Sequence, residues 1–374
     1  MVELIDAATR SERLEGLRRR MGESGLDLVA LAPSDNLRYV LGFAPHYDER
    51  ACMLLVTPSS AAVLMPSLNA EQAAGDAPEL ELVTWSDDAG PADAMRRTLA
   101  QVGANGVGRA GIDPEMRADH VLLLQKASPD TSFVSADVAV RPLREVKSDG
   151  ELRLLQAAAD AADVAMRAAF SACRPGATEL HVADAAAAAF RAEGCEEVVF
   201  TIVGAGANGA FPHYHAGHQP LAVGDAVVID IGARRDGYMS DITRMVFVGE
   251  PTPRYLEVHR TVEAAVQAGL AAARPGATCH EVDAAARAAI EDAGFGECFV
   301  HRTGHGLGIS THEPPWIMRG EDVPLKVGMV HSIEPGIYLA GEFGVRLEEI
   351  VHVTEQGCER FSSLPRDLHM ADAP

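Results

Sequence analysis

The sequence predicts a mixed α/β (α+β) fold in two domains, residues 1–145 and residues 146–374. A chain of 374 residues is long enough for two domains, each of which can bury a full core. In the first part, short apolar segments alternate with helical ones, which is typical of an α/β domain. In the second part, a set of motifs occurs twice in the same order, which indicates a duplicated unit.

The first domain is expected to begin with a charged helix and to continue with short strands. The expected elements are a helix over residues 11–21 and strands over residues 26–31, 51–56 and 62–65. The stretch of residues 141–150 is polar, contains a proline and a glycine, and precedes a long alanine-rich helix. We therefore place the domain boundary in this stretch.

The second domain contains an internal repeat. The motif Arg-Pro-Gly-Ala-Thr at residues 174–178 recurs at residues 274–278, each time after an alanine-rich helix. The threonine of each motif can N-cap a second helix, which is expected to stop at Gly194 or Gly294. Each copy is thus expected to begin with a pair of helices.

The repeat continues through a second motif into strands that carry acidic residues. Pro-Leu-Ala-Val-Gly at residues 220–224 corresponds to Pro-Leu-Lys-Val-Gly at residues 324–328. A strand is expected after each motif, with one acid on that strand and one acid on the strand that follows. The four acids are Asp230 and Asp241 in the first copy and Glu334 and Glu348 in the second.

These four carboxylates and His305 can hold two divalent cations. Two cations about 3.5–4 Å apart need bridging carboxylates and few neutral ligands. A ligand set rich in oxygen favours Mn²⁺, with Zn²⁺ or Co²⁺ as alternatives. Glycines stand on both sides of His305 in the segment His-Arg-Thr-Gly-His-Gly-Leu-Gly. We expect them to leave room for metals and substrate.

The joint pattern resembles the pita-bread metallopeptidase family, in the branch of prolidase (Xaa-Pro dipeptidase) and aminopeptidase P. The matching segments are VVIDIGARRDGYMSDITR, HRTGHGLG, SIEPGIY and VRLEEIV, which with the repeat cover about residues 150–355. The resemblance implies a creatinase-like α/β domain over residues 1–145. It also implies a pseudo-twofold duplicated pita-bread catalytic domain over residues 146–374.

The resemblance also implies roles for the five ligands. Asp230 would chelate one metal, His305 and Glu334 the other, and Asp241 and Glu348 would bridge the two. A hydroxide held between the metals would attack the scissile carbonyl, since two cations lower the pKa of water. Glu334 would also carry the proton of that water.

Four further residues are candidates for catalysis or substrate binding. The resemblance places His213 and His312 at two histidines that contact substrate and stabilise the transition state. Arg346 lies two residues before Glu348 on an expected strand, so both side chains should share one face, where Arg346 orients Glu348 or binds substrate. Tyr338 is a candidate hydrogen-bond donor near the leaving group.

Composition excludes several other classes of protein. The formal net charge of −22 argues against nucleic acid and anionic membranes as partners. No apolar run is long enough to span a membrane, and the charged N-terminal stretch lacks the apolar core of a secretory signal. We therefore expect a cytoplasmic protein. The six cysteines show no CxxC spacing, which argues against a disulfide framework or a zinc ribbon.

The resemblance implies a proline-specific peptidase that hydrolyses Xaa-Pro bonds in dipeptides or short peptides, and it implies a homodimer. One alternative is an aminopeptidase P-like or carboxypeptidase-like enzyme; another is a different small-molecule hydrolase or lyase on the same fold. A non-catalytic binding module is less favoured, because the five ligand positions are intact. The segments at residues 34–39 and 46–50 are candidate loops for contact with substrate.

Overall fold

The computed structural model describes residues 6–371. Residues 1–5, which open the N-terminal stretch discussed above, and residues 372–374 lie outside this range. The chain forms two compact units, Met1–Arg144 and Glu145–Pro374. Among the helices of residues 6–371, none is both long and apolar enough to cross a membrane.

The first unit is a six-stranded mixed sheet with helices, in the strand order β4-β3-β2-β1-β5-β6. Strands β1, β2 and β3 pair antiparallel, and β4, β5 and β6 join in parallel. The strands are β1 (Leu28–Leu31), β2 (Met53–Val56), β3 (Ala61–Pro66), β4 (Glu81–Trp85), β5 (Arg109–Ile112) and β6 (Ser132–Ser135). The helices are α1 (Ala7–Ser24), α2 (Asp35–Leu41), α3 (Ala70–Asp76), α4 (Ala92–Gln101), α5 (Ala118–Ala127) and α6 (Asp137–Arg144), with a 3-10 turn at Ser67–Asn69. The predicted α/β fold of this part is confirmed.

Strand β1 is shorter than the sequence predicts, because the residues before Leu28 have other backbone partners. The amide of Leu26 donates to the carbonyl of Met21 and closes the end of α1, where Gly25 is left-handed with φ 63°. The Asp27 carboxylate accepts the amides of Gly108 and Arg109. The apolar run at residues 26–31 is therefore divided between a helix end and a strand.

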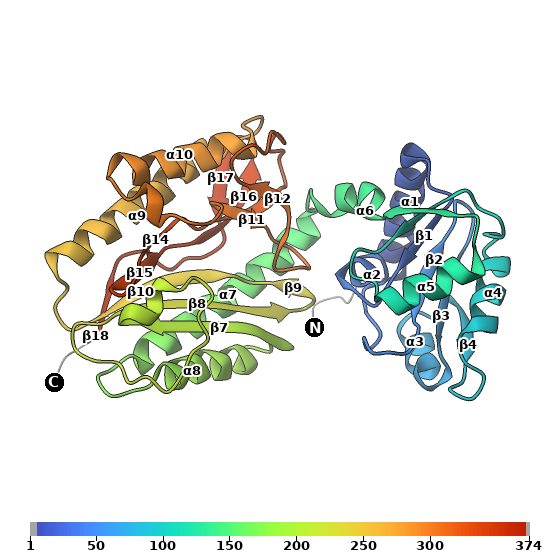
Figure 1. The fold of residues 1–374 in the computed structure, drawn as a ribbon, viewed down its shortest axis with the longest axis horizontal. Helices are drawn as coiled ribbons and strands as arrows, with labels where there is room; N and C mark the ends of the chain where they lie inside the picture. Colours follow the sequence, from blue (N-terminus) through green and yellow to red (C-terminus); the bar gives the residue numbers. More distant parts are fainter. Residues whose placement is uncertain (1–5, 372–374) are drawn as a thin grey trace. The chain divides into compact units, whose positions relative to one another are not determined.

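The second unit consists of two halves with matching elements (Figure 1). In the first half, helices α7 (Asp149–Ala172) and α8 (Glu179–Ala192) pack on a sheet of order β18-β10-β8-β7 with β9 beside β8. In the second half, helices α9 (Pro253–Ala272) and α10 (Cys279–Asp292) pack on a sheet of order β12-β11-β13-β16-β17. The strands of the first half are β7 (Glu197–Ala205), β8 (Ala226–Arg235), β9 (Tyr238–Met239), β10 (Ile242–Val248) and β18 (His369–Ala371). Those of the second half are β11 (Gly304–Gly306), β12 (Glu313–Ile317), β13 (Val330–Ile333), β16 (Glu349–Thr354) and β17 (Gly357–Arg360), with a separate hairpin of β14 (Gly336–Leu339) and β15 (Phe343–Arg346). Two 3-10 turns, Gly206–Ala210 and Gly296–Cys298, complete the unit.

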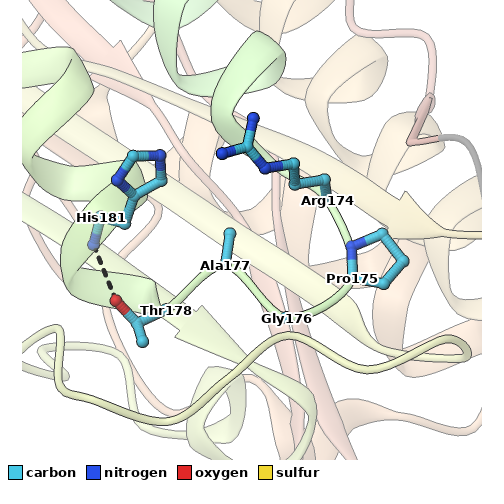
Figure 2. A pocket seen from close by; sticks show the side chains of 6 residues that line it. All are labelled: Arg174, Pro175, Gly176, Ala177, Thr178 and His181. Atoms are coloured by element: carbon cyan, nitrogen blue, oxygen red, sulfur yellow. Dashed lines mark hydrogen bonds between the residues drawn. The ribbon is translucent and has the colours of Figure 1, made fainter.

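The two repeat loops have the same local structure. The Thr178 hydroxyl accepts the amide of His181 at 3.1 Å at the start of α8 (Figure 2), and Thr278 accepts the amide of Glu281 at 3.1 Å at the start of α10. Thr178 forms a β-bridge with Pro220, and Thr278 forms one with Pro324. Each threonine therefore links its helix pair to the motif that leads into the next strand.

Each helix pair covers an apolar core, and the core under the second pair also includes side chains of β8 and β10 from the first half. The alanine-rich faces of α7 and α8 pack against β8 and β10, so small side chains let the helices lie close to the strands. In the second half, α9 and α10 pack against β13 and β16. These cores hold β8, β10, β13 and β16 in place. Each of the four predicted acidic ligands lies on one of these strands or next to its end.

Candidate metal centre

The five predicted ligands lie at strands of both halves, but not all of them on strands. Asp230 lies within β8 and His305 within β11. Asp241 directly precedes β10, Glu334 directly follows β13, and Glu348 directly precedes β16. The expectation that all four acids stand on strands is therefore wrong for these three.

The reason is that the backbone at two of these acids bonds outside its own strand ladder. The Glu334 amide donates to the carbonyl of Thr303 at 2.8 Å, and the Glu348 amide donates to the carbonyl of Thr243 at 3.3 Å. The first bond ties the end of β13 to the segment before His305. The second ties the start of β16 to β10 of the other half, so the two halves meet at the acids.

Three of the predicted ligands form one compact group. Donor atoms of Asp241, His305 and Glu348 all lie within 4.8 Å of one another. The Glu334 carboxylate adjoins this group, with its Oε1 3.1 Å from Nε2 of His305. Asp230 pairs across the β8–β10 ladder with Thr243, whose hydroxyl donates to Glu348 at 2.8 Å. Asp241, His305, Glu334 and Glu348 therefore adjoin directly, and the Asp230 side chain is linked to Glu348 through Arg346 and Thr243.

The donor set suits divalent cations, as the unsatisfied carboxylate oxygens show. Oδ1 of Asp230 and Oε1 of Glu348 are buried and have no hydrogen-bond partner among residues 6–371. Burial, followed by repulsion from neighbouring carboxylates, raises the pKa of Asp241 and Glu348 well above the ordinary carboxyl values. Buried acids held this close together need cations to remain ionised. The residues present therefore fit metal ions.

Glu334 differs from the other acids. Burial acts to raise its pKa, but a hydrogen bond and the charge of His305 outweigh that effect and hold the pKa at about 2. The Ser332 hydroxyl also donates to the Glu334 carboxylate at 3.1 Å. Glu334 is therefore the acid of the group with the greatest tendency to stay ionised.

Arg346 binds Asp230 and not Glu348. Its Nη2 lies 2.6 Å from Oδ2 of Asp230 in a buried ion pair. The expectation that Arg346 and Glu348 share one face of a strand is wrong, because Arg346 ends β15 and Glu348 precedes β16. Strand β15 pairs with β14, whereas β16 pairs with β13 and β17, so the alternation of a single strand does not apply.

A chain of hydrogen bonds extends from Asp230 through Arg346 to Tyr338 and His301. Arg346 Nη1 donates to the Tyr338 hydroxyl at 2.7 Å, and that hydroxyl lies 2.8 Å from Nε2 of His301. Nδ1 of His301 lies 2.7 Å from the Arg302 carbonyl, so a neutral ring would donate there and accept from Tyr338. Tyr338 therefore orients Arg346 and His301 together.

Sequence reasoning did not single out His301, Thr243 or Ser332. His301 opens the same short segment that contains His305, and that proximity was the available signal. Thr243 and Ser332 act through hydroxyl bonds to Glu348 and Glu334. Such bonds between distant segments have no sequence signature.

The two histidines expected to contact substrate are both exposed residues. The His312 ring meets the His305 ring edge-on with centroids 4.2 Å apart. Partial burial of the His312 ring, followed by the charge of His305, lowers the pKa of His312 to about 4. His213 lies in the segment after the 3-10 turn Gly206–Ala210. Burial is the main cause of the lowered pKa of His301 and of His312, and the charge of His213 contributes in the same direction.

The glycines around His305 serve close packing of the chain itself, so the expectation that they make room for metals and substrate is wrong. A Cβ on Gly304 would lie 2.0 Å from the carbonyl oxygen of Ser332. A Cβ on Gly306 would lie 2.3 Å from the carbonyl oxygen of Pro314. Neighbouring backbone on both sides of β11 therefore requires glycine at these positions.

Comparison with known proteins now identifies the family. The profile of metallopeptidase family M24 matches residues 153–355, more than half of the chain and all five predicted ligands. The chain belongs to this family. The profile of the creatinase/prolidase N-terminal domain matches residues 13–146. This M24 chain is thus a metal-dependent hydrolase in the prolidase group of the pita-bread metallopeptidases, as the sequence predicted.

Relatives of the M24 chain match it over nearly its whole length. It is 38% identical over 369 residues to a probable dipeptidase PepE of Mycobacterium tuberculosis, covering 97% of each chain. It is 34% identical to an Xaa-Pro dipeptidase of Lactobacillus delbrueckii subsp. lactis, covering 95% of this chain and 98% of the relative. A crystal structure of prolidase from Thermococcus sibiricus matches with a TM-score of 0.92 and 32% identity, covering 97% of this chain and 99% of that one. Dipeptidase PepE from Mycobacterium ulcerans matches with a TM-score of 0.91 and 36% identity, covering 98% and 99%.

Proposed function

We propose that the protein is a dinuclear-metal, proline-specific dipeptidase that hydrolyses the Xaa-Pro bond of dipeptides and short peptides. The observation that carries this proposal is the buried group of acids around His305, in which Asp230 and Glu348 each keep an unpartnered carboxylate oxygen among the residues that the structure describes. Its substrate is proposed from the likeness to Xaa-Pro dipeptidases over almost the whole chain.

The proposed metal ligands are Asp230, Asp241, His305, Glu334 and Glu348. Two divalent cations at these residues, with Mn²⁺ favoured, would polarise the scissile carbonyl and acidify a water molecule. The short contacts between Asp241, His305 and Glu348 support a shared position for two of the acids and the imidazole. Arg346 pairs with one oxygen of Asp230 and leaves the other one free, and so it orients that free oxygen.

The remaining site residues would act on the substrate. The Glu334 carboxylate lies 3.1 Å from Nε2 of His305, at the metal group, and would take the proton of the attacking water and pass it to the leaving nitrogen. His213 and His312 would donate hydrogen bonds to the carbonyl oxygen as negative charge develops on it. Tyr338, held by Arg346 and His301, would keep the leaving-group side of the site in place.

Product analysis after loading with Mn²⁺ tests the proposal. We expect cleavage of Xaa-Pro dipeptides with release of free proline, and no cleavage of matched Xaa-Ala dipeptides. Asp241→Asn should lose more than about a thousandfold in kcat/KM, because it removes a charged ligand of the metal group. Asp236→Asn is the matched control, since Asp236 is a turn residue with φ 52°, a conformation that asparagine tolerates.

Peptides of different length separate the alternatives. The structure of an X-Pro aminopeptidase from Thermotoga maritima matches with a TM-score of 0.84 and 32% identity, covering 96% and 99% of the two chains. Release of the first residue from Xaa-Pro-Yaa and longer peptides would favour that activity, and release of the last residue would favour a carboxypeptidase. If no Xaa-Pro bond is cleaved, the substrate proposal is wrong.

Metal identity, homodimer formation and a cytoplasmic location stay predictions. Metal analysis of the purified protein would give the number of bound ions and compare Mn²⁺ with Zn²⁺ and Co²⁺. A stoichiometry well below two ions per chain after loading would contradict the dinuclear site. Sedimentation would give the oligomeric state.

A further inference from the structure

Arg244 is a buried cation directly beside the metal group, and the proposed chemistry does not use it. It follows Thr243 on β10, and its side chain is 1% exposed. Burying a guanidinium is costly unless it is paired and all its N–H groups are bonded. Its partners therefore show what this residue does.

All five N–H donors of the Arg244 guanidinium have acceptors. Its Nη1 donates to the carbonyl oxygens of Thr243, at 3.0 Å, and Glu348. Its Nη2 donates to the carboxylate of Glu349 at 3.0 Å and to the carbonyl oxygen of Leu364 at 2.9 Å. Its Nε donates to the carbonyl oxygen of Pro365 at 3.0 Å. A planar guanidinium matches this arrangement, whereas a lysine ammonium has only three donors.

The two bonds from Nη1 join both halves of the duplicated unit at their ligands. Thr243 belongs to β10 and lies two residues after Asp241, and Glu348 is itself a proposed ligand beside β16. Strands β10 and β16 belong to different sheets. One nitrogen atom thus bonds to both backbone segments that carry the acids expected to bridge the metals.

Glu349 anchors the other side of the guanidinium. Its Oε1 also accepts from Arg366 at 2.7 Å and from Arg360 at 3.1 Å. Arg366 is largely buried and also pairs with Glu263 on α9, whereas Arg360 is 43% exposed at the end of β17. The Nη2 side of Arg244 is therefore fixed by the ion-pair group of Glu349, Arg366 and Arg360. Its Nη1 bonds to Thr243 and Glu348.

We propose that Arg244 is a positioning residue that sets the spacing between Asp241 and Glu348 and thereby the affinity of the metal site. The inference rests on the proposed metal centre and adds a residue that acts only through others. Residues that orient metal ligands typically contribute about tenfold to a hundredfold to metal affinity. Arg244 should contribute in this way because it bonds the backbone of Glu348 itself and that of Thr243, two residues after Asp241.

Titration of the metal-free protein with Mn²⁺ tests this role without relying on activity. Arg244→Lys keeps the charge opposite Glu349 but cannot bond both carbonyl groups and the remaining acceptors at once. We expect its Mn²⁺ dissociation constant to rise at least about tenfold while circular dichroism remains that of the wild type. Arg360→Gln is the matched control, because it removes another partner of Glu349 without touching a ligand segment, and it should change the constant less than twofold.

A second variant covers the case in which Arg244→Lys does not fold. Arg244→Met with Glu349→Gln removes the two buried charges together, which proteins often tolerate, and keeps an acceptor oxygen for Arg366 and Arg360. This double variant should fold and show the same loss of Mn²⁺ affinity. If either folded variant binds Mn²⁺ within twofold of the wild type, the proposal is wrong, and it is also wrong if neither variant folds.

The outcomes separate this inference from the proposed function. A wild-type chain that binds two Mn²⁺ ions but cleaves no Xaa-Pro bond contradicts the substrate, while the affinity of Arg244→Lys still decides the role of Arg244. Normal Mn²⁺ affinity in Arg244→Lys contradicts only the inference about Arg244. A wild-type chain that binds no Mn²⁺ contradicts both.

Discussion

At Gly304 and Gly306, the backbone packed around the proposed metal ligand His305 leaves no space for a side chain. The carbonyl groups of Ser332 and Pro314 occupy the space that a side chain would need at these positions. His305 lies between the two glycines, and its amide donates to the Ser332 hydroxyl at 2.9 Å. The close contact therefore holds the His305 backbone as well as filling space.

Gly304→Ala should destabilise the catalytic unit by more than about 2 kcal/mol, because its Cβ would meet backbone that cannot move aside. Denaturant unfolding measures this loss. Gly22→Ala is the control: Gly22 lies in α1, and a methyl group added there would meet no atom within 4 Å, so this variant should be neutral or stabilising. Equal stability of the two variants would contradict the packing argument.

His259 should make the stability of the protein depend on pH. It lies on α9, is 8% exposed, and its Nε2 has no partner among residues 6–371. Burial lowers its pKa, and the charge of Glu263 opposes this only in part. The folded state therefore disfavours the imidazolium form.

Because the pKa of His259 is lower in the folded state, the unfolded state takes up the proton first as the pH falls. Stability from the neutral ring is present above the ordinary imidazole pKa of about 6.5 and is lost as the pH falls below it. His259→Leu should therefore show a smaller loss of unfolding free energy between about pH 7 and pH 5.5 than the wild type. Chemical denaturation of both proteins across this pH range measures the difference. Parallel curves of unfolding free energy against pH would contradict the prediction.

At the scale of elements, the duplication explains why acids from distant parts of the chain meet. Each half provides a pair of helices, a strand with an acid on it or at its end, and a second acid just before a later strand. The matching bridges of Thr178 with Pro220 and Thr278 with Pro324 show that the correspondence extends to the backbone. His305 has no counterpart among the proposed ligands of the first half, so the metal group is asymmetric.

A buried ion pair connects the start of the catalytic unit to β12. Lys147 Nζ lies 2.8 Å from Oε1 of Glu313, and the two side chains are 1% and 5% exposed. Glu313 is the first residue of β12 and directly follows His312. The Lys147 amide donates to the carbonyl of Gly328, so this residue is fixed at both its backbone and its side chain.

Lys147→Met should destabilise the protein by about 3 kcal/mol, because it removes the buried ammonium that pairs with the buried Glu313 carboxylate. Arg319→Met removes an exposed pair with Glu291, and it should cost less than about 1 kcal/mol. Thermal and denaturant unfolding of both variants measure the difference. An equal loss of unfolding free energy in the two variants would show that burial does not increase the contribution of the Lys147–Glu313 pair to stability.

At the scale of the whole molecule, metal binding should affect one compact unit and not the other. All proposed ligands lie in Glu145–Pro374, and the segment Met1–Arg144 has a core of its own. Repulsion between buried carboxylates is relieved when cations bind, so loading should stabilise the second unit. Free metal at about a hundred times its dissociation constant would add about 2.7 kcal/mol.

Hydrogen exchange with and without a chelator measures this effect. Removal of metal should speed exchange in β8, β10, β13 and β16, and it should leave the sheet of the first unit unchanged. The Asp241→Asn variant serves as the control, because chelation should then have little further effect. A uniform change over both units would contradict the assignment of the metal group to the second unit alone.

The sequence by itself determined the family and the α/β class, and it singled out four acids and a histidine that the structure connects through short contacts. Motif order was sufficient for these features because paired acids and repeated caps are local patterns that folding preserves. It also predicted the helix starts at Thr178 and Thr278, which the structure confirms. The helix starts depend on residues near one another in the chain, and the acids were found because the repeated motifs place them at matching points of the two halves.

Only the tertiary structure decided which partners the site residues take. Arg346 binds Asp230 and not Glu348, since β15 and β16 belong to different sheets. The glycines around His305 face neighbouring backbone, and Arg244 joins Thr243 to Glu348 across the two halves. These contacts link residues that are far apart in the chain, and no local pattern encodes them because they arise when the two halves pack together.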